Sequence, residues 1–494
     1  MHIKIKNNSF IVNKNIQLII VGIFVQLVYL LISKYYFQIG FPLDDSWIHQ
    51  TYARNLIEYG GWYFVPGIPS AGSTSPLWTF FLIPGFIFKA NFFYYWTFAL
   101  SGIIFISSAV LFQKLFEKIT KVSPNIPWAG FLFLLEWHLV WSVNSGMETI
   151  LYIFVILIIF YYLITRKSNY LWVCWLLLGL VIFIRPDGVT LIGPYLMLNF
   201  IYVRRKETSA FKNGIFGLMV VISIVFLYAL FNYQIAGEFL PNTFFAKQAE
   251  YQVLYSKPLI SRILDMFLVS LTGAGILLLP GFLYYFYVSI SKKYWEILSA
   301  YFWFFGYLLI YAIRLPVTYQ HGRYVIPTIP IFLLLSAVGT YFLIQGALKE
   351  KKLLIFGYKV AVTVILFIFF VLGGRALAED VAIIQTEMVD TAKWIHENLP
   401  ASSVIAAHDI GALGFYANRQ IVDLAGLISP EVIPFIRDEE QLSNYMDLNG
   451  VNYLVVFPGW YTELDQSKIE IFSTNGKFSP QAGGENMTIY IWEQ

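Results

Sequence analysis

Two adjacent carboxylates, Asp44 and Asp45, open the stretch "DDSWIHQ" directly after the first long apolar segment of the chain. One carboxylate is enough to cap the helix that we expect over residues 46–59. The second is then free, and two acids side by side near lipid repel each other, which raises the pKa of one and makes it a usable proton acceptor. The pair is therefore a candidate general base, with a helix cap and a solvated neighbour as the alternative.

Four candidate cations stand at the ends of different apolar segments: Arg185, Lys247, His321 and Arg323. Arginine and lysine are natural partners of a phosphate. Any one of them could instead extend its side chain to the lipid headgroups. Glu148 stands where an acid favours the start of a helix, so that position has a structural explanation as well. Together, the cations and the acid pair suit a reaction on a lipid-linked phosphate.

Long apolar segments must position these residues. Hydrophobic residues make up 58% of the 494 residues, and the net charge of +3 is too small to indicate a nucleic-acid partner. Apolar runs of this length and number predict a polytopic α-helical membrane protein. Cys174 is the one cysteine and is predicted to be a small buried or lipid-facing residue. We predict about eleven spans, at residues 16–38, 93–113, 125–142, 148–165, 169–185, 188–203, 212–234, 267–290, 295–313, 323–346 and 352–373.

Lysine and arginine in the short loops predict the orientation of these spans. Lys4, Lys6 and Lys14 precede the first span, which places the N-terminus in the cytoplasm. The later basic loops fall on the same side if the short segment 76–89 is only half embedded. The first outer loop is then 39–92. Ile48, Tyr52, Leu56 and Tyr59 recur at about four-residue spacing, so we expect the helix over 46–59 to lie along the interface with this face in lipid. The remaining polar clusters then all fall on the outer side; they are residues 44–50, 144–149, 185–188, 238–248 and 318–324.

The composition changes after residue 374. Residues 375–494 have ordinary surface polarity, and "SSVIAAHD", "QIVDLAG" and "VNYLVVF" are typical of short buried strands. We therefore divide the chain into a transmembrane module, 1–374, and a soluble α/β domain, 375–494, on the outer side. No nucleotide-binding or zinc-binding motif is present.

The ordered motifs resemble those of a known superfamily. The acid pair, "ARNL", "GSTSPLW", "SGMET", "RPDG", "LPNTFFAK", "HGRY" and "DIGALGFY" follow one another between about residues 40 and 430. This set resembles the GT-C glycosyltransferases, polytopic enzymes that use polyprenyl-phosphate sugars, and most of all the bacterial terminal arabinofuranosyltransferase-like group. The order of motifs is fairly specific for the superfamily and only weakly specific for the substrate.

The resemblance implies roles for the residues that match its motifs. Asp44 or Asp45 would be the catalytic base. The implied contacts to the donor phosphate or substrate are Lys247, Arg323, His321, Arg185, Asn242, Glu148 and Tyr324. His408 and Asp409 would contact the acceptor or only shape a turn. Some members bind a divalent metal at acidic motifs, for which Asp44, Asp45 and Glu148 are available, although nothing in the sequence requires a metal.

The sequence thus predicts an inverting membrane glycosyltransferase of the bacterial inner membrane. Its donor would be a polyprenyl-phosphate monosaccharide, and its acceptor a glycan, glycolipid or protein of the cell envelope. A transporter or flippase is one alternative, but ionisable groups in transporters gather near the midplane, often in repeated halves. A non-catalytic binder of lipid-linked sugars is the other, and the acid pair argues against it.

Overall fold

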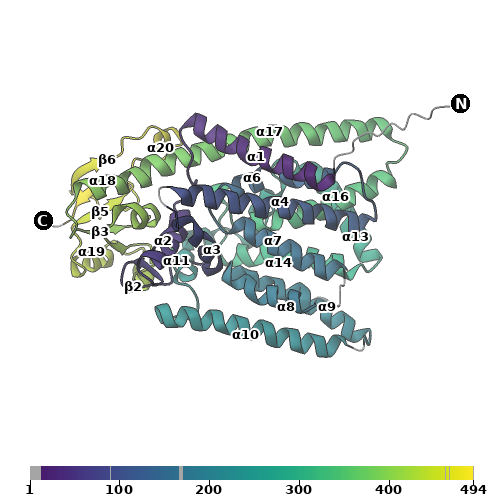
Figure 1. Cartoon of the computed structure of the whole chain (residues 1–494), viewed down its shortest axis with the longest axis horizontal. Coiled ribbons are helices and arrows are strands. Elements are labelled where there is room, and N and C mark those ends of the chain that lie inside the picture. Colours follow the sequence, from purple (N-terminus) through teal and green to yellow (C-terminus); the bar gives the residue numbers. More distant parts are fainter. Residues whose placement is uncertain are drawn as a thin grey trace.

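The computed structural model describes residues 13–88, 91–165, 171–207, 209–461, 463–466 and 468–492. Lys4, Lys6 and the basic segment 166–168 lie outside these ranges. The chain forms a bundle of helices, and a smaller domain with a β-sheet caps one end of the bundle (Figure 1).

Six helical stretches of the described residues are long and apolar enough to cross a membrane. They are α1 (Lys14–Tyr36), α4 (Phe92–Thr120), α10 (Ala210–Ala236), α14 (Trp295–Arg314), the stretch Tyr319–Gln345 and the stretch Lys352–Asn398. Tyr319–Gln345 contains α15 (Tyr319–Gly322), η6 (Ile326–Thr328) and α16 (Ile329–Gln345). Lys352–Asn398 contains α17 (Lys352–Ile384), the π-helix η7 (Gln385–Val389) and α18 (Asp390–Asn398). A seventh span results if α12 (Leu259–Leu271) and α13 (Gly275–Ser291), which meet at 109°, are counted as one.

The expected count of about eleven spans is not confirmed, because several apolar runs are broken into shorter helices. The run 125–142 divides into α5 (Trp128–Leu134) and α6 (Trp137–Val143). Glu136 ends the first and caps the second, where its carboxylate accepts a hydrogen bond from the Leu139 N–H at 3.0 Å. The other short elements in this part are α7 (Thr149–Thr165), α8 (Leu171–Leu180), η3 (Val181–Phe183), η4 (Pro186–Leu191) and α9 (Ile192–Arg204).

The segment 76–89 is short and broken, as its proline and glycine predict. It forms α3 (Pro76–Leu82) and the 3₁₀ helix η1 (Ile83–Phe86), which pack against α2 (Asp45–Glu58). A small hairpin of β1 (Tyr63–Val65) and β2 (Ile68–Pro69) connects α2 to this segment. Further along the chain, α11 (Asn242–Glu250) and η5 (Gln252–Ser256) follow α10.

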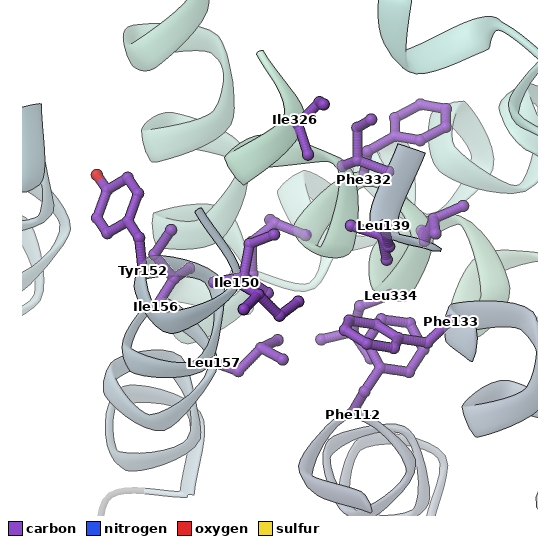
Figure 2. Close-up of a cluster of buried hydrophobic side chains, with 14 of the residues drawn as sticks. Phe112, Phe133, Leu139, Ile150, Tyr152, Ile156, Leu157, Ile326, Phe332 and Leu334 are labelled. Atoms are coloured by element: carbon purple, nitrogen blue, oxygen red, sulfur yellow. The ribbon is translucent and has the colours of Figure 1, made fainter. Parts of the chain in front are cut away.

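Helix packing produces a dense apolar interior. Figure 2 shows one part of it, where Phe112 and Phe133 lie together below Leu139 and Leu334. The rings of Phe112 and Phe133 are 5.3 Å apart and both side chains are fully buried. Because such interiors are close-packed, the backbone that carries the polar residues is held firmly.

The polar segments and the basic loops separate along the bundle. The ends of α9 and α16 and the starts of α1, α10 and α17 lie at the end away from the sheet domain (Figure 1). The polar clusters of the sequence meet at the other end, next to that domain.

The C-terminal domain has the α/β character expected of it. The three predicted strands are present as β3 (Val404–Ala407), β4 (Gln420–Asp423) and β5 (Tyr453–Val456), joined by β6 (Ile469–Ser473) and β7 (Thr488–Ile491). The sheet order is β4-β3-β5-β7-β6, with β3 parallel to both neighbours and β7 antiparallel to both of its own. The remaining elements are η8 (Leu413–Ala417), η9 (Pro430–Phe435), α19 (Glu439–Leu448) and α20 (Phe478–Gln481).

Several contacts join this domain to the bundle, and two of them concern the predictions from the sequence. The helical stretch Lys352–Asn398 runs without a break through the expected boundary at 374/375. The second contact is α2, whose Ile48 and Tyr52 are buried in one hydrophobic cluster with Ile410 and Leu413 of the domain. The expectation that Ile48 and Tyr52 face lipid is therefore wrong, because the C-terminal domain and the nearby Trp62 and Phe64 cover that part of the helix, whereas Tyr59 at its end is exposed.

Candidate active site

A cavity of about 720 Å³ lies where the helical bundle meets the C-terminal domain. Its bundle side contains the acid pair and cations from α11 and the α15 turn. Its domain side contains the loop after β3 and the loop after β5. The charged and aromatic residues that line it are Asp44, Asp45, Lys247, Glu250, Tyr251, Tyr319, Arg323, Asp380, His408, Asp409, Arg437, Glu439, Phe457, Trp460, Tyr461 and Glu485.

Asp45 holds two cations inside this cavity. Its Oδ2 lies 2.9 Å from the Lys247 Nζ and 2.8 Å from an Arg323 guanidinium nitrogen. Three separate segments supply these groups: Asp45 begins α2, Lys247 lies on α11 and Arg323 follows α15. The sequence-based expectation that these three residues share one site is therefore met by direct contacts. We call them the cavity cluster.

The charges of the cavity cluster fix its protonation. Burial alone would raise the pKa of Asp45, but Lys247 and Arg323 outweigh it and hold this pKa well below its usual value. Burial would lower the pKa of Lys247, as would Arg323, yet Asp45 and nearby tyrosines raise it. All three groups are thus charged at neutral pH, and one carboxylate stands between two cations. The remaining positive charge can attract an anion.

A strained turn positions Arg323. Gln320, His321 and Gly322 all have positive φ angles, of 51°, 59° and 69°. Such a run is costly for residues other than glycine, and it occurs mainly where surrounding structure holds a functional group in place. A Cβ on Gly322 would also lie 2.6 Å from a methyl group of Val269.

Tyr324 continues from this turn and contacts the same guanidinium. Its hydroxyl accepts a hydrogen bond from Arg323 Nη2 at 3.0 Å, and its ring centre lies 4.9 Å from the Arg323 Cζ. The Lys247 Nζ lies 5.9 Å from the same ring. Tyr324 therefore supports both cations of the cavity cluster from behind, without lining the cavity.

His321 lies apart from the cavity cluster. Its Nε2 is 2.8 Å from Asp380 Oδ2, which also accepts a hydrogen bond from the Trp141 indole at 2.9 Å. Asp380 lines the cavity and His321 does not. The expected contact of His321 with the donor phosphate is thus not evident in the geometry, which instead anchors the strained turn to α17 and α6.

Asp44 has a different role from its neighbour. No side-chain hydrogen bond from Asp44 caps α2, which corrects the expectation of a helix cap. Its carboxylate instead accepts hydrogen bonds from the backbone N–H groups of Gly411 at 2.6 Å and Ala412 at 2.8 Å, in the C-terminal domain. Burial, together with Asp409 and Asp45, raises the pKa of Asp44 to about 8 against the effect of these N–H groups. A Cβ on Gly411 would lie only 2.1 Å from the Asp44 carbonyl oxygen, so only glycine permits this approach.

Glu148 and Arg185 belong to a second, deeper group that we call the inner cluster. Arg185 lies 3.2 Å from a Glu148 oxygen and 3.1 Å from an Asp187 oxygen. The hydroxyls of Tyr307 and Tyr311 also donate hydrogen bonds to Asp187. Neither Arg185 nor Glu148 lines the cavity. The sequence-based grouping of Arg185 with Lys247 and Arg323 around one cavity is therefore not supported.

Asn242 begins α11 and is only 1% exposed. Within the described residues, neither its side-chain oxygen nor its nitrogen has a hydrogen-bond partner. It is not among the residues that line the cavity, so its expected place beside Lys247 at the substrate is not evident.

His408 and Asp409 line the cavity from the domain side. His408 Nδ1 lies 2.9 Å from the Tyr461 hydroxyl, and its Nε2 lies 3.6 Å from Glu250 on α11. Burial would lower the pKa of His408, but Glu250 and Asp409 raise it above its usual value. The sequence favours a role for these two residues in shaping a turn. Because both line the cavity, they are also placed to contact a substrate.

The three acids available for a divalent metal are not gathered in one place. Asp44 binds backbone N–H groups, Asp45 binds two cations and Glu148 binds Arg185. In the part of the chain that the structure describes, no three His, Cys, Asp or Glu side chains are grouped as a metal would require. The residues at hand therefore do not fit the metal site that the resemblance allowed.

Sequence reasoning missed Asp380 and Glu250. Asp380 lies in "RALAED", a polar part of the long and otherwise apolar helix α17, which brings it to the cavity. Glu250 lies three residues after Lys247, on the same face of α11. In the sequence, the signal for Glu250 was an acid at helical spacing from a cation, and the signal for Asp380 was an acid at the end of a span. Both signals are weak without knowledge of the fold.

Comparisons with known proteins agree with this architecture. Residues 380–490 match a domain of unknown function (DUF8728). No curated protein matches the sequence. ArnT from Cupriavidus metallidurans, solved with bound undecaprenyl phosphate, is similar in structure with a TM-score of 0.61 at 14% identity, over 97% of this chain and 98% of the other. The apo oligosaccharyltransferase of Archaeoglobus fulgidus gives 0.58 at 11% identity, over 90% of this chain and 69% of the other.

A second archaeal structure shows the same likeness. AglB from Archaeoglobus fulgidus, in complex with an inhibitory peptide and a dolichol-phosphate, gives a TM-score of 0.53 at 12% identity, over 88% of this chain and 69% of the other. At these identities the likeness establishes the fold alone. The chain is a helical membrane protein of the GT-C fold with a sheet domain at its C-terminal end.

Proposed function

We propose that this protein is an integral membrane glycosyltransferase that moves a monosaccharide from a polyprenyl-phosphate donor to an acceptor of the cell envelope. The reaction would take place at the outer face of a bacterial inner membrane. The observation that carries the proposal is the cavity cluster, in which Lys247 and Arg323 share one carboxylate inside a cavity at the end of a helical bundle.

The donor phosphate would bind these two cations. Arg323 offers a planar fork that suits two phosphate oxygens, and Lys247 offers a compact charge beside it. In the structure, the Asp45 carboxylate forms ion pairs with both Lys247 and Arg323. A bound phosphate would compete with Asp45 for them, so the carboxylate would turn away from its partners as the donor enters. Its pKa would then rise towards its ordinary value, which suits a proton acceptor.

The transfer itself follows from this arrangement. The acceptor hydroxyl oxygen attacks the anomeric carbon, and the bond between that carbon and the phosphate oxygen breaks. The hydroxyl proton passes to Asp45, and the polyprenyl phosphate leaves as an anion held by Lys247 and Arg323. Attack from the side opposite the phosphate inverts the anomeric centre. Asp44, bound to Gly411 and Ala412, would hold the C-terminal domain over the site.

The fold supports a lipid-linked donor. The structures similar to this chain include one with undecaprenyl phosphate and one with a dolichol-phosphate and an inhibitory peptide. The sequence motifs favour the terminal arabinofuranosyltransferase-like group within this fold. The assay below identifies the donor and so determines whether a pentose or a hexose is transferred.

The test is transfer in membranes or nanodiscs that contain the full chain, with a panel of labelled polyprenyl-phosphate pentoses and hexoses. We expect one donor to be consumed by the wild type and about 10³-fold more slowly by Asp45→Asn, the loss typical of a missing general base. Asp44→Asn is expected to slow transfer less, because it weakens domain docking. Transfer that survives Asp45→Asn would refute the base assignment. Movement of the lipid across vesicles without transfer would instead support a flippase.

A further inference from the structure

The part of the cavity wall that the C-terminal domain builds differs in chemistry from the cavity cluster. Asp409, Glu439 and Glu485 line it, together with the aromatic residues Phe457, Trp460 and Tyr461. Arg437 and His408 line the same wall, and Arg437 donates a hydrogen bond to the backbone carbonyl of Glu250. One cavity therefore has a cationic side for a phosphate and an acidic, aromatic side that would repel an anion.

Trp460 is the most unusual residue of this wall. Its side chain is 51% exposed although it lines a cavity. Its ring contacts those of Phe457, with ring centres 5.1 Å apart, and His408, with ring centres 5.2 Å apart and the two planes perpendicular. A large aromatic ring that is packed against two other rings yet exposed to water is unfavourable unless a ligand covers it.

Asp409 supplies the polar part of the same wall. Within the described residues, its carboxylate makes no hydrogen bond or ion pair that would occupy it. Burial, with Asp45 and Glu250, raises the pKa of Asp409 to about 6 in spite of His408 and Lys247. At neutral pH Asp409 is thus largely ionised, and an ionised carboxylate only accepts hydrogen bonds, which hydroxyl groups can donate.

A neutral sugar ring has the chemistry that fits this wall. Its C–H face is apolar and can cover an aromatic ring, while its rim carries hydroxyl donors for a carboxylate. Sugars with carboxylate or phosphate groups would meet repulsion from Asp409, Glu439 and Glu485. A peptide could donate its backbone N–H groups to the carboxylate, so the test below includes peptides as a separate outcome.

We infer that the domain wall is an acceptor subsite that binds a neutral sugar residue, with the ring stacked on Trp460 and a hydroxyl donated to Asp409. This inference rests on the proposed function, since it names the acceptor class of the same cavity. His408 is a positioning residue in it, fixed by Tyr461 and Glu250. The sugar belongs to a soluble glycan or to the headgroup of a glycolipid.

The test uses the full chain in nanodiscs and measures two bindings separately. Acceptor binding is measured on an array of neutral oligosaccharides, acidic oligosaccharides and peptides. Donor-side binding is measured with undecaprenyl phosphate. The variants are Trp460→Ala, Trp460→Phe and Asp409→Asn. Trp172→Ala is the matched control, because Trp172 is 59% exposed on α8.

We expect the wild type to bind neutral oligosaccharides in preference to acidic ones and peptides. Trp460→Ala should weaken this binding about tenfold, Trp460→Phe should retain most of it, and Asp409→Asn should weaken it several-fold. Binding of undecaprenyl phosphate should be unchanged in these variants, which also shows that they are folded. The same oligosaccharide presented free and on a lipid distinguishes a glycan from a glycolipid source.

Three results would overturn the inference while leaving the proposed function intact. They are undecaprenyl phosphate binding without any neutral glycan binding, glycan binding that Trp460→Ala does not change, and a preference for acidic glycans or peptides. If the wild type binds neither undecaprenyl phosphate nor a glycan, the proposed function fails as well.

Discussion

The cavity cluster and the inner cluster both lie next to one tyrosine ring, that of Tyr324. The Cζ atoms of Arg323 and Arg185 are 4.9 and 6.0 Å from the centre of the Tyr324 ring. In the cavity cluster, the Asp45 carboxylate pairs with two cations. In the inner cluster, Arg185 pairs with two carboxylates, Glu148 and Asp187.

The difference shows why a cation at the end of an apolar segment has no single meaning. Arg185 and Arg323 have similar surroundings in the sequence, and each is 9% exposed. Arg185 is fully neutralised by buried partners and holds segments together. Arg323 is only half neutralised, at the wall of a cavity, and can take another anion. The balance of partners, which only the fold reveals, is our reason for proposing that Arg323 binds an anion and that Arg185 is structural.

Removal of Arg185 should have the largest effect of any single change in the two clusters. Arg185→Met leaves Asp187 buried without a cation in contact and leaves Glu148 with only the His49 imidazole, 3.4 Å away, which costs about 3–5 kcal/mol of folding free energy. We expect the variant to aggregate or to unfold at a clearly lower temperature in detergent. The control is Arg314→Met, an exposed arginine at the end of α14. Equal thermal stability of the two variants would show that the inner cluster is not structural.

Removal of a cation from the cavity cluster should affect binding instead of folding. Lys247→Met or Arg323→Met takes away a charged hydrogen bond to the phosphate, so the affinity for undecaprenyl phosphate should fall about 10- to 100-fold. The protein should remain folded, because the Asp45 side chain is 26% exposed and water can solvate it. Loss of folding without a separate loss of binding would erase the distinction between the clusters.

Asp45→Asn tests the same comparison. We expect it to change the affinity for undecaprenyl phosphate less than the loss of a cation does, and in the opposite direction. Asp45 competes with the phosphate for Lys247 and Arg323, so its neutral analogue should bind undecaprenyl phosphate about fivefold more tightly, as for a partly exposed pair worth about 1 kcal/mol. Transfer should nevertheless be lost. Glu148→Gln, the matched change in the inner cluster, should not tighten binding. Weaker binding by Asp45→Asn would mean that the carboxylate supports the cations more than it blocks them.

The smallest expected effect is a pH dependence of domain docking. The pKa values of Asp44 and Asp409 are raised by burial to about 8 and about 6, so both acids bind protons more tightly in the folded chain than when unfolded. Their protonated forms contribute fully to folding stability below the carboxyl pKa of the unfolded chain. This contribution is lost as the pH rises through about 6 for Asp409 and then about 8 for Asp44. Hydrogen exchange at Gly411 and Ala412 should therefore accelerate, beyond its intrinsic rate, from pH 5 to 8. A flat profile for the wild type, or the same profile in Asp44→Asn, would contradict this role of Asp44.

The sequence predicts some levels of this molecule better than others. Apolar runs and basic loops suffice for a helical membrane bundle, because their signal is local. The strands of the C-terminal domain and the convergence of Asp45, Lys247 and Arg323 were also predicted. The number of spans was not, because breaks such as the one at Glu136 depend on local capping within apolar sequence.

The fates of Asp44 and Asp45 could not be read from their positions in the chain. They are adjacent, yet one binds the backbone of a domain more than 360 residues away and the other binds two cations. For the same reason Ile48 and Tyr52 were expected to face lipid, since no local pattern shows that a distant domain covers them. Long-range packing decides these roles.

The most direct test of the account is an electron cryomicroscopy structure of the full chain with undecaprenyl phosphate in a nanodisc. We predict phosphate density between the Lys247 ammonium and the Arg323 guanidinium, with the Asp45 carboxylate displaced from both and Arg185 still bound to Glu148 and Asp187. Phosphate density elsewhere in the cavity, or an Asp45 that keeps both cations while the lipid is bound, would contradict it.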